Sequence, residues 1–382
     1  MARRCYRRAA RTTSAPGPVA AGGTAGCSTV GRVIDARLST VPLPRPGALL
    51  PPWPGAMVPV TGGEVFVRHT PWSGPLPVGD AAGGAASADA PHERALYVHG
   101  LGGASTNWTD LAALLAVRFD GWALDLPGFG QSAPPARYSI HRHVQAVVDV
   151  LEWIIARPGP GQGRPVHLAG NSLGGLVSVW VAARRPDLVA SLTLISAAMP
   201  VYRVPAAFDR AIALVLLPGV PALAERRLAG ASPEQRVRGL LQMCFGDPSR
   251  VPPERVAEAV EETRRRDEQP WAGQALTRSL RGLMSSYLRV GRANAWRMAR
   301  SVRAPSLVVW GDRDRLVDPE LAPRLAEVLP DARLQVQAGI GHLAMLEAPE
   351  PTARAVLGLA EDAAGGPATY RSDGAGLAAG QA

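Results

Sequence analysis

Short apolar segments alternate with longer amphipathic segments along the middle of this chain, and this alternation restricts the fold more than any other feature. An apolar run of about six residues is typical of a buried strand, whereas apolar residues spaced three and four apart are typical of a helix. Strands that alternate with helices form a mostly parallel sheet with helices on its faces. We therefore expect an α/β fold with eight strands at residues 56–60, 64–69, 94–99, 121–126, 165–170, 191–196, 306–311 and 333–338.

The segments between these strands have the pattern of helices. Ser139 is a candidate N-cap, because its side chain can accept a hydrogen bond from the first turn. The apolar residues that follow it at helical spacing are Val144, Val147, Val148, Leu151, Ile154 and Ile155. They give this helix one apolar face with which to cover the sheet.

One region interrupts the alternation, because residues 200–300 hold several helix-like segments and no convincing strand. A helical insertion of this length between two strands is expected to form a cap over the sheet. A Gly- and Ala-rich stretch at 72–90 is expected to be a long flexible loop. The expected organisation is a disordered tail at 1–53, a core in two parts at 54–199 and 301–361, the cap at 200–300 and a second disordered tail at 362–382.

The net charge of +9 does not indicate a nucleic-acid partner. None of the 41 basic residues is a lysine, and many of the arginines are interspersed with acids, as at 261–268, which is typical of a solvated helix surface. No nucleic-acid recognition motif accompanies the charge. Stable membrane insertion is not expected either, because the longest apolar segment, 211–224, is interrupted by Pro218 and Pro221.

The cysteines and the first residues favour a cytoplasmic protein. Cys5, Cys27 and Cys244 are odd in number and have no spacing typical of a disulfide framework or a zinc site. The first 26 residues are rich in arginine and lack the apolar core of a secretory signal. A disordered tail is the expected reading of this segment, and an organellar transit peptide is the alternative.

A serine between two glycines stands at the end of one predicted strand, in the sequence HLAGNSLGG. The Gly-x-Ser-x-Gly pattern of Gly170, Ser172 and Gly174 is weak evidence by itself, and a glycine-rich turn with an incidental serine is the alternative. Here an apolar strand precedes it and a predicted helix follows it. A sharp strand-to-helix turn projects the serine hydroxyl from the sheet, and only small flanking residues allow the two elements to approach so closely. Ser172 is therefore a candidate nucleophile.

A serine hydroxyl needs a base, and the base needs a carboxylate that orients it. Of the seven histidines, His342 is the best candidate, because it follows the last predicted strand in a glycine-containing loop. Three acids follow the strand that ends at Gly311, and Asp318 precedes a proline in the pattern of a helix N-cap. The spacing alone does not choose between Asp312 and Asp314.

The negative oxygen of an acyl-transfer intermediate requires backbone N–H donors. Leu173 can supply one from the helix that follows the serine, and Leu101 another from the loop HGLGGAS after a strand. The glycines of this loop do not fit a phosphate-binding or dinucleotide-binding motif. Residues expected to support the site from neighbouring positions are His99, Gly100, Gly102 and Asn171.

With these residues in place, roughly residues 55–360 resemble the serine-dependent, cap-bearing α/β-hydrolases. The order of nucleophile, acid and base matches that family, and the segments HGLGG, LDLPGFGQS, VVWGDRD and GHLAMLEAPE match its habits. The resemblance places the acid three residues after Gly311, which selects Asp314. It also gives Asp125 a role in loop structure near the site.

The resemblance implies a serine hydrolase that cleaves an apolar carboxylic ester through an acyl-enzyme intermediate, with no metal or organic cofactor. A carbon–carbon hydrolase of the meta-cleavage product type shares the GNSxGG sequence, but Leu343 and the LGG of the oxyanion loop depart from its pattern. A peroxide-using acyltransferase and a ligand-binding receptor of the same fold are further alternatives. The sequence leaves the natural substrate and the oligomeric state open.

Large apolar residues of the predicted cap either line an acyl pocket or pack the cap helices together. These residues are Phe208, Leu214, Leu216, Leu217, Met243, Phe245, Met284 and Tyr287.

Overall fold

A nine-stranded, mostly parallel sheet is the central element of the computed structural model, which describes residues 34–44, 50–74, 92–201 and 230–365. Its strand order is β1-β9-β8-β7-β6-β4-β5-β3-β2, and only the pairs β2–β3 and β3–β5 are antiparallel. The strands are β1 (Ile34–Asp35), β2 (Gly55–Val60), β3 (Gly63–Thr70), β4 (Glu93–Val98), β5 (Phe119–Leu124), β6 (Val166–Asn171), β7 (Val189–Ile195), β8 (Ser306–Gly311) and β9 (Ala332–Gln337). The predicted α/β class is confirmed, and each of the eight predicted strands lies within two residues of an observed one.

The ninth strand, β1, was not predicted, because it lies inside the segment 1–53 that was expected to be a disordered tail. Its two residues pair in parallel with β9, and the N–H of Ala36 continues the ladder to the carbonyl oxygen of Leu334 at 2.9 Å. Ser39 is buried beneath the C-terminal helix. A strand of two residues is too short to leave a periodic pattern, so it could not be predicted. Residues 1–33 and 45–49 of the expected tail lie outside the described residues.

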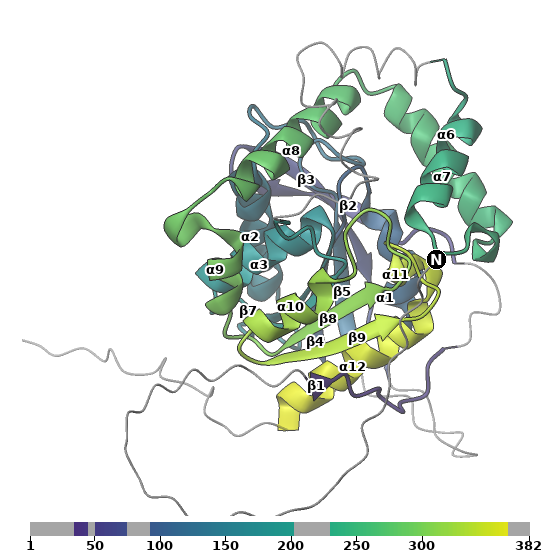
Figure 1. The fold of residues 1–382 in the computed structure, drawn as a ribbon. Coiled ribbons are helices and arrows are strands. Elements are labelled where there is room, and N and C mark those ends of the chain that lie inside the picture. Colours follow the sequence, from purple (N-terminus) through teal and green to yellow (C-terminus); the bar gives the residue numbers. More distant parts are fainter. Residues whose placement is uncertain (1–33, 45–49, 75–91, 202–229, 366–382) are drawn as a thin grey trace, which may run out of the picture. The chain divides into compact units, whose positions relative to one another are not determined.

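Two hydrophobic layers hold helices against opposite faces of the sheet (Figure 1). One layer contains α2 (Ile140–Ala156), α3 (Leu173–Arg184), α9 (Ala295–Arg300) and α10 (Leu321–Val328). The other contains α1 (Thr109–Leu115), α11 (Ala344–Glu347) and α12 (Pro349–Gly365), so helix continues into the predicted tail at 362–382. The N-cap of α2 is Ser139, as expected, and its hydroxyl accepts from the N–H of Arg142.

Every secondary-structure element described between β7 and β8 is a helix. This segment contains α6 (Pro233–Cys244), α7 (Pro253–Asp267) and α8 (Ala272–Tyr287), and then α9. The α9 helix packs against α3 and belongs to the core layer, because Trp296 is buried and donates its indole N–H to the carbonyl oxygen of Pro200. The predicted boundary at residue 300 therefore places α9 on the wrong side. Residues 202–229 of the expected cap, and 75–91 in and beside the expected loop, lie outside the described residues.

Candidate active site

The candidate residues lie at the edge of the sheet where the parallel strands end. The carboxyl ends of β4, β6, β8 and β9 lead into the loops that hold the residues considered below. In sheets of this kind that edge is where ligands bind. Sequence positions as distant as 99 and 342 are thereby brought together.

Ser172 occupies a strained turn between β6 and α3. Its backbone has φ 52° and ψ −116°, an unusual conformation for a residue other than glycine. A Cβ at Gly170 would lie 2.5 Å from the carbonyl oxygen of Gly174, and one at Gly174 would lie 2.5 Å from that of His99. Any larger side chain at either position would separate β6, α3 and the loop after β4. The close packing of β6, α3 and this loop thus explains why glycines flank the serine.

His342 and Asp314 form a buried pair across two neighbouring loops. Nδ1 of His342 lies 2.8 Å from Oδ2 of Asp314, and the carboxylate has no exposed surface. The other carboxylate oxygen accepts from the N–H groups of Leu316 and Val317, at 2.9 and 3.0 Å. These bonds fix the carboxylate and turn Nε2 of the imidazole away from it.

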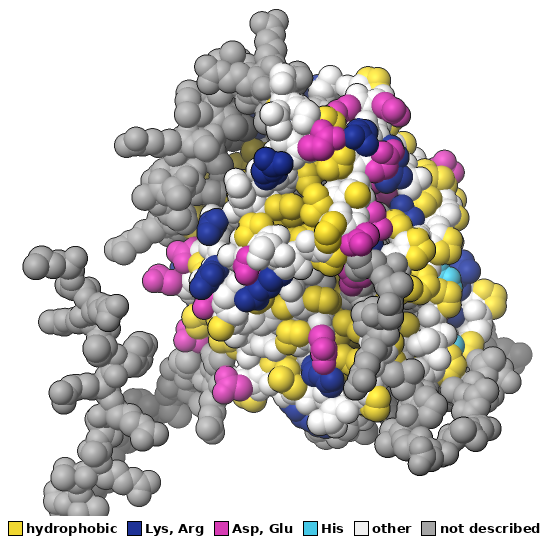
Figure 2. Space-filling view, turned by 90° about the vertical axis from the view of Figure 1, so that its right-hand side faces the viewer, with side chains coloured by type: hydrophobic (Ala, Val, Ile, Leu, Met, Phe, Trp, Pro, Cys, Tyr) yellow, Lys and Arg dark blue, Asp and Glu magenta, His cyan; other side chains and the backbone are white. Residues whose placement is uncertain are grey.

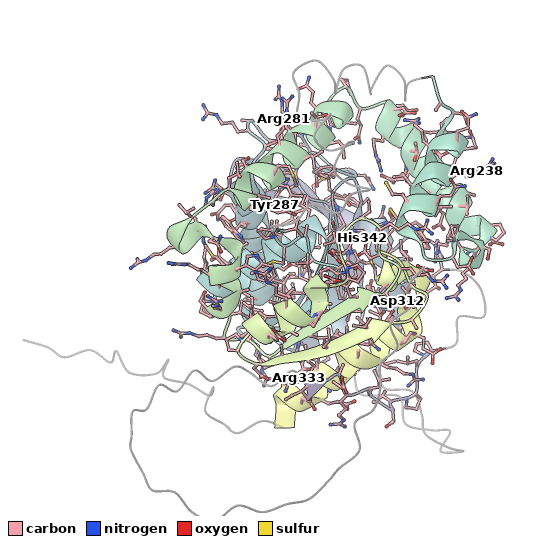
Figure 3. All side chains as sticks on the ribbon, viewed as in Figure 1. Arg238, Arg281, Tyr287, Asp312, Arg333 and His342 are labelled. Carbon is pink, nitrogen blue, oxygen red and sulfur yellow. The ribbon has the colours of Figure 1, made fainter. Side chains whose placement is uncertain are left out.

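The other two acids that follow β8 have structural partners. Asp312, whose loop lies beside that of His342 (Figure 3), accepts from the N–H of Gly339 at 2.6 Å. Asp318 accepts from the N–H of Glu320 at 3.0 Å, in the turn that precedes α10. Between the two acids that spacing left open, the structure therefore pairs Asp314 with the histidine.

Asn171 connects the serine turn to the histidine loop. Its amide Nδ2 donates to the carbonyl oxygens of Ile195 and His342, each at 3.1 Å. The side chain is buried beside Ser172. Asn171 thus holds these two loops together.

The loop after β4 is held by two buried side chains. His99 accepts from the N–H of Leu126 at Nε2, so its Nδ1 carries the proton and donates to the carbonyl oxygen of Gly100 at 2.7 Å. Burial lowers the pKa of His99, which keeps the ring neutral. Asp125 accepts from the N–H groups of Ser105 and Gln131 at 2.5 and 2.9 Å, and so connects the loop after β4 to the loop after β5.

The two predicted donors of the oxyanion hole border the serine. Leu173 begins α3, where the first N–H groups of a helix have no partner within it. The N–H of Leu101 makes no hydrogen bond to another described residue. The loop approaches the serine closely at Gly100, where an added Cβ would lie 3.0 Å from Cβ of Ser172. Gly102 in the same loop has φ 75°, a backbone conformation that favours glycine.

A cavity of about 2400 Å³ opens above these groups, and Leu101, Ser172 and His342 line it. No hydrogen bond of the described residues joins the hydroxyl of Ser172 to Nε2 of His342. Such bonds are often long in unliganded active sites and shorten when substrate binds.

A family model described as the alpha/beta hydrolase fold matches residues 96–349, about two thirds of the chain. The chain belongs to the α/β-hydrolase fold family. Curated relatives of this α/β-hydrolase include Lipase 3 of Moraxella sp. (strain TA144), 27% identical over 269 residues that cover 68% of this chain and 75% of the lipase. Lipase 1 of Psychrobacter immobilis is 27% identical over 265 residues, which cover 68% and 74%.

Solved structures show the same fold. A membrane phospholipase A aligns with a TM-score of 0.60 at 24% identity and covers 82% of this chain and 87% of its own. A meta-cleavage product hydrolase from Pseudomonas fluorescens aligns with a TM-score of 0.61 at 18% identity and covers 81% and 98%. At these identities the likeness establishes the fold alone.

The helical segment α6–α8, which the sequence predicts to form a cap and which is called the cap below, contributes apolar residues to the cavity wall. Met243, Phe245, Met284 and Tyr287 all line it, and the hydroxyl of Tyr287, labelled in Figure 3, donates to the carbonyl oxygen of Ala198 at 3.1 Å. Phe245 is also buried, so lining the cavity and packing the cap are not exclusive. The other cap residues considered above, Phe208, Leu214, Leu216 and Leu217, lie outside the described residues.

The histidine loop is hydrogen-bonded to the cap as well as to the core, which the sequence analysis missed. The N–H of His342 donates to the carbonyl oxygen of Cys244 at 2.7 Å. The carboxylate of Glu347 accepts from the N–H groups of Gly341, Gly246 and Asp247, at 2.7 to 2.9 Å. Glu347 was visible in the segment GHLAMLEAPE, but its three backbone donors come from two segments about 100 residues apart, so no local pattern reveals them.

The charged segment 261–268 is largely exposed, as predicted for a solvated helix surface, but one side of it faces the cavity. Of its charged residues only Glu262 and Arg266 are half-buried, and both line the cavity, whereas Arg264 is exposed and does not. Acidic and basic side chains are interspersed on the outer face seen in Figure 2. No helix among the described residues is long and apolar enough to cross a bilayer.

Proposed function

We propose that this α/β-hydrolase cleaves carboxylic esters with an apolar acyl group through an acyl-enzyme formed on Ser172. The observation that carries the proposal is the buried hydrogen bond from His342 to Asp314 beside a strained serine that lines the same cavity. A carboxylate that accepts from Nδ1 fixes the imidazole with Nε2 free to act as a base. The lipases among the relatives support an ester as the substrate.

In this mechanism Nε2 of His342 takes the hydroxyl proton of Ser172 as the serine oxygen attacks the acyl carbonyl. The N–H groups of Leu101 and Leu173 bind the resulting oxyanion. The tetrahedral intermediate then collapses, the ester bond breaks and the alcohol leaves with the proton from His342. Water repeats the sequence on the acyl-enzyme and releases the carboxylic acid.

The test replaces Ser172 with alanine and measures hydrolysis of p-nitrophenyl esters of increasing chain length. Turnover is expected to fall by about 10⁴-fold or more, and labelling by a fluorophosphonate is expected to disappear. Unchanged circular dichroism and thermal unfolding would show that the fold is intact. Turnover by Ser172→Ala equal to that of the wild type would refute the mechanism.

A carbon–carbon hydrolase is the second candidate, because a meta-cleavage product hydrolase is among the similar structures. Leu343, which directly follows His342, is one of the positions at which the chain departs from the pattern of that class. A vinylogous diketone assayed beside the esters separates the two activities. Faster cleavage of the diketone than of every ester would favour the second candidate. Slow labelling without turnover of any compound would favour a ligand-binding receptor.

A further inference from the structure

Charged side chains line the part of the cavity formed by α6 and α7, and the acidic ones all have partners. A buried or half-buried charge is costly unless another group compensates it, so such pairing is the expected condition. The ion pairs are Arg255 with Asp110 and Glu258, Arg236 with Asp267, Arg265 with Glu262, and Arg264 with Glu261, while Asp318 and Glu347 accept from backbone N–H groups.

Arg266 is different from its neighbours on α7. Its side chain lines the cavity and is only partly exposed, yet the guanidinium forms no ion pair or hydrogen bond with any described residue, although Glu262 and Asp267 act on it electrostatically. Burial lowers the pKa of Arg266, and its charge contributes to lowering the pKa of His99. The guanidinium therefore lies close enough to the loop after β4, which borders Ser172, to act on it electrostatically.

The position of Arg266 is fixed, because α7 is fastened to the core near both ends. Arg255, in its first turns, bonds the carboxylate of Asp110 on α1, with Nε to Oδ2 at 3.0 Å and Nη2 to Oδ1 at 2.5 Å. Gln269, just beyond its last residue, donates to the carbonyl oxygen of Gly130 at 2.7 Å. Gly130 belongs to the loop that Asp125 holds. These contacts thus hold α7, and with it Arg266, in the wall of the cavity that Ser172 and His342 also line.

We propose that Arg266 binds an anionic group of the substrate, so that the preferred ester carries a carboxylate or a phosphate in addition to its apolar chain. A guanidinium binds both anions through two parallel N–H bonds. The apolar wall that includes Met243 and Met284 accommodates the chain. This inference rests on the proposed ester hydrolysis, because it assigns a substrate class to that same site.

The first experiment compares p-nitrophenyl monoesters of dicarboxylic acids of four to ten carbons with p-nitrophenyl esters of monocarboxylic acids that have the same number of methylenes. A second pair, a monoacylglycerol and the same compound with a 3-phosphate, distinguishes phosphate from carboxylate. The wild type is expected to prefer the anionic member of at least one pair. Arg266→Gln should lower kcat/KM for that member by about tenfold or more and change the neutral member by less than about twofold.

Arg265→Gln is the matched control, because Arg265 lines the same cavity but is paired with Glu262 at 2.7 Å. It should leave the ratio of anionic to neutral turnover unchanged, and Arg266→Lys should retain part of the preference. Normal turnover of neutral esters by Arg266→Gln would show that this variant is folded. Equal turnover of charged and neutral esters by the wild type and Arg266→Gln at every length would overturn the inference while leaving ester hydrolysis intact.

A binding measurement separates the two proposals if no ester is turned over. Titration calorimetry on Ser172→Ala compares monomethyl esters of the same dicarboxylic acids, and the 3-phosphate, with their neutral counterparts. The inference is supported if Ser172→Ala binds an anionic compound more tightly than its neutral counterpart and if adding Arg266→Gln to this variant removes the difference, even where hydrolysis fails. Equal affinities for all pairs overturn it.

Discussion

Nδ1 of His342 lies 2.8 Å from a carboxylate oxygen of Asp314, and the remaining oxygen of that carboxylate is taken by two backbone N–H groups. Both oxygens of the carboxylate therefore accept hydrogen bonds from the protein. The carboxylate cannot rotate away from the imidazole without breaking the bonds to Leu316 and Val317. The loop after β8 therefore determines how the imidazole of His342 is oriented.

Asp314→Asn is expected to lower kcat for ester hydrolysis by about 10⁴-fold, because an amide no longer enforces the tautomer in which Nε2 is free. Asp312→Asn is the control, since among the described residues that carboxylate accepts only from the N–H of Gly339 and does not meet His342. It should lower kcat by less than about tenfold. A loss for Asp312→Asn as large as that for Asp314→Asn would contradict the assignment of the acid.

Glu347 is expected to position the histidine loop through the cap. Glu347→Gln replaces one carboxylate oxygen by an NH₂ group that cannot accept from Gly341, Gly246 or Asp247. Hydrogen bonds to a charged group contribute about 1.5–3 kcal/mol each. We expect kcat and the rate of fluorophosphonate labelling to fall together, because both require His342 to activate Ser172.

Glu350→Gln is the control for this prediction, because Glu350 is a surface residue whose carboxylate is paired with Arg354 at 2.9 Å. Thermal unfolding of both variants separates a positioning effect from a loss of stability. If Glu347→Gln lowers the unfolding temperature but leaves the labelling rate unchanged, Glu347 stabilises the fold and does not position His342.

The sheet and the candidate nucleophile could be predicted because their signals are local. The strand β6 is a short, mostly apolar run, and the glycines beside Ser172 directly reflect the close approach of β6 to α3. His342 could be placed because it follows the last long strand. In contrast, the spacing of Asp312 and Asp314 in one loop does not choose between them; the family resemblance selects Asp314, and the structure shows which partner each carboxylate meets.

The cap contributes the part of the site that the sequence did not predict. Segment 261–268 has the alternating charges of a solvated helix, and its sequence does not say which of Arg264, Arg265 and Arg266 faces the cavity. That depends on how α7 is rotated, which the contacts of Arg255 and Gln269 decide. Similarly, β1 is stabilised by β9, about 300 residues later in the chain, and not by its own sequence.

The glycines of the serine turn provide a test of the packing argument. In Gly174→Ala the added methyl would lie 2.5 Å from the carbonyl oxygen of His99 and would push α3 away from the loop after β4. We expect a loss of stability of about 1–3 kcal/mol in urea unfolding. Gly239→Ala on α6 is the control, because its Cβ would meet no atom within 4 Å and alanine favours a helix by about 0.5–1 kcal/mol. Equal stabilities for the two variants would refute the close approach.

His143 predicts how the stability of the fold depends on pH. It is fully buried on α2, its Nε2 lies 3.2 Å from Oγ of Ser279 on α8, and its Nδ1 has no partner among the described residues. Burial lowers its pKa to about 3, with smaller contributions from the charges of His99 and Arg142. Between that value and about 6.5, the pKa of a histidine in an unfolded chain, the unfolded state binds more protons than the folded one.

Protonation therefore favours unfolding, and the free energy of unfolding must fall as the pH drops below about 6.5, by up to about 1.4 kcal/mol per pH unit from this residue. His143→Gln keeps a polar side chain opposite Ser279 but cannot titrate, so its stability should decline less steeply by that amount between pH 6 and pH 4. Urea unfolding monitored by tryptophan fluorescence at several pH values measures both slopes. His99, whose pKa is also lowered by burial, still titrates in the variant and leaves a residual slope. Parallel curves for the wild type and His143→Gln would mean that His143 takes up its proton in the folded state at an ordinary pH.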